Sequence, residues 1–354
     1  MSTRRVRVLI VDDSAIVRQL LAQELGRDPK IEVVGTAGDP YVARDKILSE
    51  KPDVLTLDIQ MPRMDGLTFL RKLMIFHPMP VVVLSSLTGN GAHAGVEALE
   101  CGAVDVLSKP ACEGRENLAE AIAPLAEAIK AAAQARPRQT LSSVTSAEKI
   151  HPARVAPGRN TGNIIVLGAS TGGTEALRTI LTALPPDAPG VLAVIHMPEG
   201  FTHRFAERLN EQCSIDVHEA HDGDPVRAGQ ALIARGDRHL TMARVGNGYV
   251  AEVRKGPPIC RHRPSVEVLF QSAARVAGPK AMGVILTGMG ADGAAGLLAL
   301  RNAGAYTVAQ NEATSVVFGM PKEAIELGAA IDVLPIEDIA GACMRWSSAG
   351  QAKC

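Results

Sequence analysis

Three polar residues stand where short apolar stretches of the chain end, and together they could perform acyl transfer. These residues are Ser170, His196 and Asp292. A serine hydroxyl becomes a strong nucleophile when an imidazole takes its proton, and a carboxylate orients that imidazole. If the three stretches are strands of one parallel sheet, their carboxyl ends lie along the same edge. We therefore predict that the three side chains meet there.

The residues around Ser170 support this prediction and also leave alternatives. Residues 168–172 read GASTG, which fits the G-x-S-x-G pattern of a nucleophile on a tight strand-to-helix turn. A glycine-rich turn can instead hold a phosphate group or only pack a helix closely against a strand. The dinucleotide pattern G-x-G-x-x-G fits less well, because Ser170 stands in place of its middle glycine. The chain order Ser, His, Asp also differs from that of the α/β-hydrolases.

Further polar residues follow apolar stretches in the first part of the chain: Asp12, Asp13, Asp58, Ser85 and Lys109. Three carboxylates that converge on one site repel one another unless a cation neutralises them, and an all-oxygen set suits Mg²⁺. A lysine and a hydroxyl beside that ion could bind the oxygens of a phosphoryl group. An aspartate after a strand is also a common N-cap of the next helix, and for Asp13 alone this alternative stays open.

Alternating strand and helix patterns must position both groups of residues. Continuous Val/Ile/Leu stretches separated by amphipathic segments are typical of parallel sheets covered on both faces. The fold class predicted is α/β, with two doubly wound parallel-sheet domains joined by a linker. The expected strands are residues 6–11, 31–35, 53–57, 81–84 and 103–107 in the first domain. In the second domain they are residues 164–168, 191–195 and the first part of 281–293, which runs into a glycine-rich turn.

The join between the two domains lacks apolar periodicity and is rich in Ser, Thr, Pro and Arg. Such a segment has little surface to bury and is typical of a linker. We predict domains at residues 1–125 and 161–350, with the linker at 126–160. A helix is expected to run from Asn117 toward this segment, with Pro124 breaking or kinking it.

Composition restricts the partners and the compartment. The chain of 354 residues has a net charge of −1, which gives no support to bulk attraction to nucleic acid or membranes. The six cysteines form no C-x-x-C pair, which is typical of reduced thiols. The apolar run near the N-terminus is too short for a signal peptide. We therefore expect a cytoplasmic protein that neither binds nucleic acid nor inserts into a membrane.

Four motifs of the first domain resemble the receiver domain of two-component response regulators: VDDS at 11–14, LDIQMPRMDG at 57–66, LSS at 84–86 and SKP at 108–110. The resemblance implies a flavodoxin-like domain in which Asp58 accepts the phosphoryl group and Asp12, Asp13 and Asp58 bind Mg²⁺. Ser85 would be the switch hydroxyl and Lys109 the phosphate contact. Val106 stands where many receivers carry an aromatic residue, so signalling through a swinging ring is not expected.

The second domain resembles the chemotaxis response-regulator protein-glutamate methylesterases. The motifs are GASTGG, VIHMPEGFT, TGMGADGAAGL, HRPSVEVLF (262–270) and QNEATSVVFGMPKEAIELGA (310–329). The resemblance implies a Rossmann-like domain without a cofactor, in which Ser170, His196 and Asp292 form the triad and Thr171 and Met289 are active-site neighbours. The sequence departs from the family at residue 235, an arginine where proline is frequent, and at residue 260, a cysteine that is not a recognised family feature.

The same resemblance implies a function. The substrate would be the γ-methyl ester of glutamate on the cytoplasmic helices of a methylated chemoreceptor, with methanol as a product, and specific receptor glutamines would be deamidated. A chemotaxis histidine kinase would supply the phosphoryl group. The receiver would cover the active-site edge until it is phosphorylated, so deleting residues 1 to about 130 is expected to raise basal activity. The alternative is a response regulator whose second domain binds a partner or a nucleotide without turnover.

Overall fold

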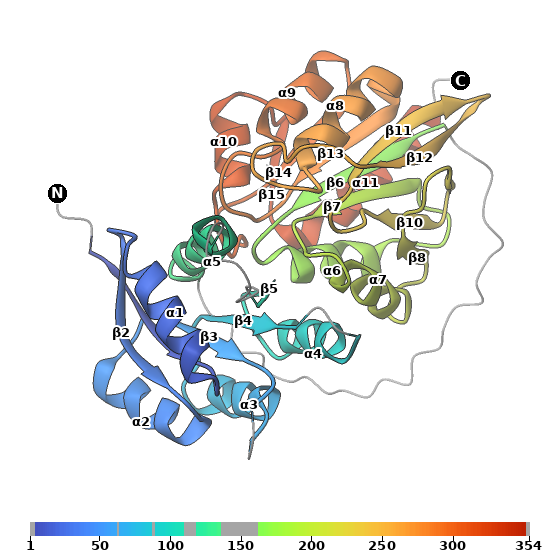
Figure 1. The fold of residues 1–354 in the computed structure, drawn as a ribbon. Helices are drawn as coiled ribbons and strands as arrows, with labels where there is room; N and C mark the ends of the chain where they lie inside the picture. Colours follow the sequence, from blue (N-terminus) through green and yellow to red (C-terminus); the bar gives the residue numbers. More distant parts are fainter. Residues whose placement is uncertain (1–3, 62–63, 87–88, 110–117, 136–161, 352–354) are drawn as a thin grey trace. The chain divides into compact units, whose positions relative to one another are not determined.

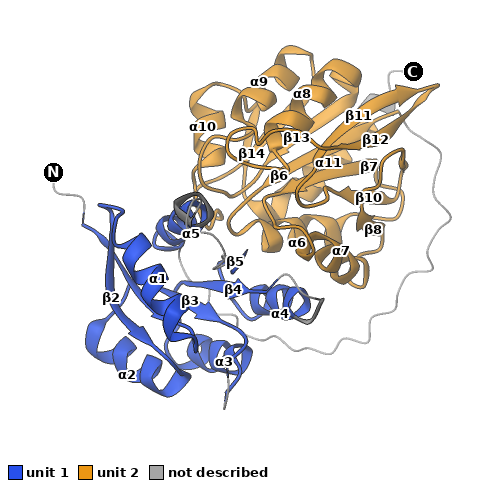
Figure 2. Cartoon of the chain, viewed as in Figure 1, with its two compact units in different colours: residues 1–144 blue, residues 145–354 orange. Residues whose placement is uncertain are grey.

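The computed structural model describes residues 4–61, 64–86, 89–109, 118–135 and 162–351. The chain divides into two compact units, residues 1–144 and 145–354 (Figure 2). Beyond residue 135, the predicted linker lies outside the described residues. The predicted domain boundaries therefore stay a prediction.

The first unit is built on a parallel sheet with the strand order β2-β1-β3-β4-β5 (Figure 1). This is the order of flavodoxin-like domains, so the predicted fold is confirmed. The strands are β1 (Val6–Val11), β2 (Ile31–Ala37), β3 (Val54–Asp58), β4 (Val81–Ser85) and β5 (Asp105–Ser108), and the helices are α1 (Ala15–Leu25), α2 (Pro40–Glu50), α3 (Gly66–Phe76), α4 (Gly89–Glu100) and α5 (Leu118–Ala132).

Local sequence explains most of these boundaries, and α5 is the exception. Ser14 and Asp65 cap α1 and α3, and each side chain accepts a hydrogen bond from a backbone N–H of the first turn. Helix α5 runs through Pro124 to Ala132, past the predicted boundary at residue 125, so the helix is not broken at the proline, and the predicted alternative of a kink stays a prediction. Its apolar side chains, including Ile122 and Ile129, lie in the core of the unit, and this burial offsets the cost of the proline.

The second unit is built on a larger parallel sheet, ordered β15-β14-β13-β6-β7-β10-β8. Its strands are β6 (Ile164–Ala169), β7 (Gly190–Ile195), β8 (Asp216–Glu219), β10 (Gln230–Ile233), β13 (Ala281–Ile285), β14 (Tyr306–Gln310) and β15 (Asp332–Leu334). The doubly wound prediction is confirmed for this sheet. A small antiparallel sheet, which the sequence did not predict, is added by β9 (Pro225–Val226), β11 (His239–Val245) and β12 (Gly248–Arg254).

Helices cover both faces of the large sheet (Figure 1). One layer contains α8 (Val266–Val276), α9 (Ala294–Asn302) and α10 (Met320–Glu326), and the other contains α6 (Gly173–Ala183), α7 (Phe201–Asn210) and α11 (Ile336–Gln351). Strands β6, β7 and β13 are fully buried between these layers. Because burial on both faces fixes these strands, the loops at their carboxyl ends start from rigid positions.

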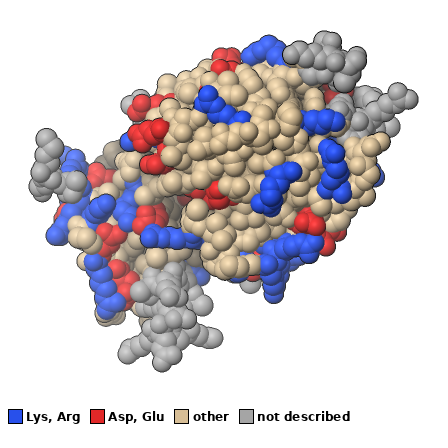
Figure 3. Space-filling view, turned by 90° about the horizontal axis from the view of Figure 1, so that it is seen from above, with Lys and Arg blue, Asp and Glu red and all other residues tan. Residues whose placement is uncertain are grey.

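The described residues contain no helix long and apolar enough to cross a membrane. On the face drawn in Figure 3, basic and acidic side chains are interspersed among other residues. This distribution agrees with the net charge of −1.

Candidate active site

Three neighbouring strands of the large sheet end at the predicted triad. Ser170 follows β6, His196 follows β7, and Asp292 lies in the loop after β13. The sheet order places β6 between β13 and β7. The predicted meeting of the three side chains at one sheet edge is what the structure shows.

The three side chains form a continuous chain of hydrogen bonds. Ser170 Oγ lies 3.0 Å from His196 Nδ1, and His196 Nε2 lies 2.7 Å from Asp292 Oδ2. An ionised carboxylate only accepts hydrogen bonds, so Nε2 carries the proton and the neutral ring presents Nδ1 to the serine hydroxyl. The side chains of His196 and Asp292 are 7% and 2% exposed. The arrangement can activate Ser170 by general-base catalysis.

The turn that carries Ser170 needs its glycines. Gly172 has φ +76° and precedes the first residue of α6. A Cβ at Gly172 would lie 2.5 Å from Val316 Cβ, and one at Gly288 would lie 2.7 Å from Ser170 Cβ. A side chain at Gly172 would collide with Val316, and one at Gly288 would collide with Ser170. Gly288 therefore lets the loop after β13 pack directly against the serine.

The carboxylate of Asp292 is held by the N-terminus of α8. Ser265 Oγ donates to Oδ1 at 2.7 Å, the Val266 N–H to Oδ2 at 2.7 Å and the Glu267 N–H to Oδ1 at 3.1 Å. Burial acts to raise the pKa of Asp292, but the hydrogen bonds from His196, Ser265 and Val266 outweigh it and lower the pKa. Asp292 therefore stays ionised and can stabilise an imidazolium.

The first unit has a second polar site at the carboxyl ends of its strands. Asp12, Asp13 and Asp58 each place a carboxylate oxygen within 4.8 Å of the others. Lys109 Nζ lies 2.8 Å from Asp12 Oδ2 and 2.7 Å from Asp58 Oδ2. This all-oxygen set fits a hard divalent cation such as Mg²⁺.

Comparisons with known proteins identify the families that the two parts of the chain resemble. The family model described as CheB methylesterase matches residues 165–343, and the response regulator receiver domain model matches residues 8–123. The chain is 56% identical over 352 residues to protein-glutamate methylesterase/protein-glutamine glutaminase 5 of Anaeromyxobacter dehalogenans, covering 97% of each chain. It is 53% identical over 359 residues to the protein of that name from the group 3 operon of Rhodopseudomonas palustris, covering 99% of each.

The chain belongs to the CheB methylesterase family. A solved structure, the CheB methylesterase catalytic domain of Thermotoga maritima, is 39% identical with a TM-score of 0.51, covering 52% of this chain and 98% of that domain. The fold class predicted from the sequence is confirmed by this likeness.

The predicted neighbours of the triad lie on the two loops that meet at Ser170. Thr171 is buried, and its carbonyl accepts a hydrogen bond from Thr287 Oγ1 at 3.0 Å. Met289 directly follows Gly288, the residue that packs on Ser170, and is half-buried. Both residues are therefore beside the serine in this CheB-family chain, and their catalytic roles stay a prediction.

Two contacts of the triad were not predicted from the sequence. Ser265 holds Asp292, and the ring of His262 stacks on that of His196, with centroids 3.7 Å apart and planes at 7°. Both lie in the motif HRPSVEVLF, whose serine before an apolar run is a helix N-cap signal. That signal could have predicted the cap. It carries no information about the distant His196.

The electrostatics of the receiver site differ from those of the triad. Burial and the nearby Asp12 raise the pKa of Asp58, although Lys109 and the Gln60 N–H act to lower it. Burial acts to lower the pKa of Lys109, but its bonds to Asp12 and Asp58 raise it overall. Ser85 Oγ, fully buried, donates to the Gly91 carbonyl of α4 at 2.8 Å. The predicted switch hydroxyl is thus bound to the helix that follows it.

Proposed function

We propose that this chain is a phosphorylation-controlled hydrolase that removes methyl esters from glutamate side chains of chemoreceptors and deamidates specific receptor glutamines. The observation that carries the proposal is the hydrogen-bond chain from Ser170 through His196 to Asp292. Curated relatives are named for the same two reactions. The outcome would be adaptation in chemotaxis.

The residues perform the ester reaction in two halves. Ser170 Oγ attacks the ester carbonyl while His196 Nδ1 takes the hydroxyl proton, and Asp292 stabilises the resulting imidazolium. The imidazolium then gives its proton to the departing methoxide, which leaves as methanol. A water molecule, deprotonated by the same nitrogen, attacks the acyl-serine and releases glutamate. A glutamine amide passes through the same steps and releases ammonia.

Phosphorylation acts through the first unit. Asp58 would accept the phosphoryl group from a histidine kinase, and Mg²⁺ held by Asp12, Asp13 and Asp58 would neutralise the oxygens during transfer. Phosphorylation adds charge and acceptor oxygens that Lys109 and a rotated Ser85 can bind. Such rotation would release the bond from Ser85 to Gly91 in α4. The receptor helices and the kinase are the expected partners.

The proposal is tested by methanol release from a purified methylated chemoreceptor, with and without a small phosphodonor and Mg²⁺. Release by the native chain that is absent in Ser170→Ala establishes the reaction, since loss of the nucleophile costs about 10⁶-fold in serine hydrolases. Ser348→Ala, a change on an exposed part of α11, is the matched control. No release from any receptor, together with resistance of Ser170 to a phosphonate probe, would favour a binding domain without turnover.

Removal of the receiver tests the control mechanism. Helix α5 extends to Ala132, and the first compact unit extends to residue 144. A chain starting at residue 145 is therefore a better truncation than one starting near 130. We expect higher basal methanol release than from the full chain without phosphodonor. Equal or lower release from a folded truncation would argue against simple occlusion.

A further inference from the structure

The ring of His196 has its two nitrogens and one of its faces engaged. Its nitrogens bond to Ser170 and Asp292. The His262 ring covers one face, nearly parallel at 7° and with centroids 3.7 Å apart. His262 comes from the segment between β12 and α8, whereas His196 follows β7. Hydrogen bonds alone leave an imidazole free to tilt about the line joining its partners. A stacked ring removes that freedom.

The segment that carries His262 also holds Asp292. Three residues after His262, the N-terminus of α8 begins with Ser265, whose hydroxyl bonds to Asp292 at 2.7 Å. The next N–H, of Val266, bonds to the same carboxylate at 2.7 Å. A shift of this short segment would therefore move the stacked ring and the carboxylate together. The segment that carries His262 therefore sets the positions of both the His262 ring and the Asp292 carboxylate, which contact His196.

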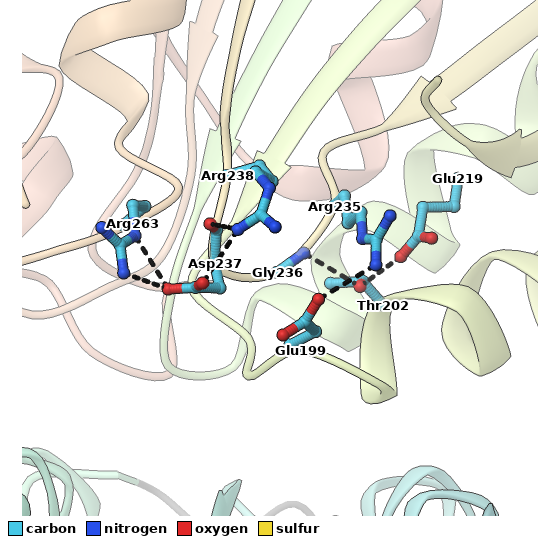
Figure 4. Close-up of polar contacts among 8 residues, drawn as sticks. All are labelled: Glu199, Thr202, Glu219, Arg235, Gly236, Asp237, Arg238 and Arg263. Atoms are coloured by element: carbon cyan, nitrogen blue, oxygen red, sulfur yellow. Dashed lines mark hydrogen bonds and ion pairs between the residues drawn. The ribbon is translucent and has the colours of Figure 1, made fainter. Parts of the chain in front are cut away.

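A network of polar contacts fastens this segment to the loop between β10 and β11 (Figure 4). Arg263 Nε donates to Asp237 Oδ1 at 2.8 Å, and its Nη2 contacts the same oxygen. Arg263 Nη1 donates to the carbonyl of Gly256 at 2.6 Å. Burial acts to raise the pKa of Asp237, but Arg263 and Arg238 lower it overall. The carboxylate is therefore charged at neutral pH and able to hold the guanidinium.

The β10–β11 loop is in turn fixed against the segment that follows His196. The Gly236 N–H donates to the buried Thr202 Oγ1 at 3.1 Å. A Cβ at Gly236 would lie 2.4 Å from the Glu199 nitrogen, so the two backbones are in close contact. Arg235 pairs with Glu199 at 3.0 Å on the exposed side. The support for His262 thus returns to the segment that carries His196 itself.

The charge state of His262 suits a stacking role. Burial lowers its pKa to about 4, with His196 and Arg261 adding to the effect and Asp292 opposing it. His262 is therefore neutral near pH 7. The face of a neutral aromatic ring attracts a cation, so the stack can remain when His196 becomes an imidazolium.

We propose that His262 is a positioning residue, which holds the His196 ring in the plane shared by Ser170 and Asp292, and that the Asp237–Arg263 contact keeps His262 in place. The kinetic part of this proposal rests on the proposed function, because it takes His196 as the base. The structural part, a fixed ring with one tautomer, does not.

The first test compares His262→Ala with His262→Phe in the full chain, using methanol release from the methylated receptor. A small misplacement of a reacting group can cost about 10²-fold, so His262→Ala is expected to lower kcat by about 10- to 100-fold with KM within about twofold. His262→Phe restores a stacking face and should recover most of the loss. A His262→Ala protein with kcat within twofold of the native chain, or a His262→Phe protein no better than His262→Ala, would overturn the proposal.

The second test breaks the support without touching the stacked ring. Asp237→Asn keeps the size of the side chain but removes the charge that Arg263 binds, and we expect the kcat loss of His262→Ala to be reproduced in part. The matched control is Glu252→Gln, which breaks the ion pair with the exposed Arg254 of β12 and should leave kcat unchanged. Equal effects of the two variants would refute the role of the Asp237–Arg263 contact. This arm also decides the matter if His262→Ala does not fold.

The third test does not depend on catalysis. Nitrogen NMR of histidine-labelled full chain reports which ring nitrogen of His196 carries the proton. We expect the single Nε2–H form in the native chain and a mixture of tautomers in His262→Ala, with the single form restored in His262→Phe. An unchanged spectrum in His262→Ala would overturn the proposal even if activity falls. If the native chain releases no methanol, the proposed function fails and this arm still decides whether His262 orients the ring.

Discussion

Asp58 and Asp292 are buried to nearly the same extent, 1% and 2% exposed, yet the pKa of the first is raised and that of the second is lowered. Each lies at the carboxyl edge of a parallel sheet, one as the last residue of β3 and the other after β13. Burial acts to raise the pKa of both carboxyls, but for Asp292 hydrogen bonds outweigh it. What differs is the number and the charge of their neighbours.

Asp58 has few donors and a like charge beside it. Lys109 and the Gln60 N–H contact it, while Asp12 lies close enough to share Lys109. Asp292 receives hydrogen bonds from His196, Ser265 and two N–H groups of α8. The same sheet edge therefore supports two chemistries. A carboxylate under repulsion is suited to bind a cation and a phosphoryl group, and a fully bonded carboxylate is suited to orient a base.

The largest expected effect is the loss of kcat on Asp292→Asn. The amide can present N–H to His196 Nε2, which favours the wrong tautomer and leaves no acceptor on Nδ1 for the serine proton. We expect a fall of about 10⁴-fold in kcat, the size known for the same change in serine proteases. Methanol release measures it, with Asp338→Asn, an exposed change in α11, as control. A fall of less than tenfold would mean that the bonds of Asp292 serve only the fold.

The next effect concerns Asp58 and the switch. Asp58→Asn cannot accept a phosphoryl group, so the rise of methanol release with phosphodonor and Mg²⁺ should vanish. Coupling between two sites is typically worth about 5- to 150-fold, which sets the size of the stimulation that is lost. Asp45→Asn, on the exposed surface of α2, should keep the full response. Stimulation that survives in Asp58→Asn would place the phosphorylation elsewhere.

A smaller effect separates the two aspartates by stability. The folded-state pKa of Asp58 lies above its ordinary value near 4, so its favourable contribution is present below about pH 4 and is lost as the pH rises through the folded pKa. Asp58→Asn does not titrate and should be more stable than the native chain near pH 7, by about 1 kcal/mol or roughly 2–4 °C in Tm of the first unit. The gain should shrink toward pH 4.

Asp292→Asn should behave in the opposite way. Its lowered pKa contributes stability above the ordinary value of an aspartate, about pH 4, and this stability is lost as the pH falls through the folded pKa. The asparagine variant should therefore be less stable near pH 7. Scanning calorimetry of the two variants without Mg²⁺ measures both signs. Destabilisation by Asp58→Asn at pH 7 would show that the pair with Lys109 outweighs burial and the repulsion from Asp12.

The sequence predicted those parts of this comparison that depend on neighbouring residues in the chain, and it did not predict those that depend on distant contacts. Ser170, His196 and Asp292 were predicted because each follows an apolar strand, a pattern that local residues fix. The same is true of Asp12, Asp58 and Lys109. The opposite pKa shifts of Asp58 and Asp292 could not be predicted from the sequence. The hydrogen-bond donors to Asp292 come from α8, which is distant from it in the chain.

Contacts between residues distant in the sequence explain the features that the sequence did not predict. The stack of His262 on His196 depends on the contact between Arg263 and Asp237. No sequence pattern around Arg263 or Asp237 indicates that these two residues meet. Helix α5 continues through Pro124 because its apolar face fills the core, which outweighs the local effect of the proline. Tertiary contacts decided both cases, and the local sequence pattern did not show them.

The smallest expected effect uses Cys260 as a reporter of the charge on Asp292. Cys260 is exposed as a residue, although its thiol group is partly buried. This partial burial is the largest cause of its raised pKa, and the negative charges of Asp292 and Glu267 raise the pKa further. Alkylation requires the thiolate, so iodoacetamide should modify Cys260 slowly near pH 7.5. Asp292→Asn removes one of those charges and should speed the modification several-fold, read from the Cys260 peptide by mass spectrometry. Cys101, whose pKa burial also raises, lies in the first unit and should keep its rate. Equal Cys260 rates in the two proteins would mean that Asp292 is not charged, and the contrast with Asp58 would then fail at its source.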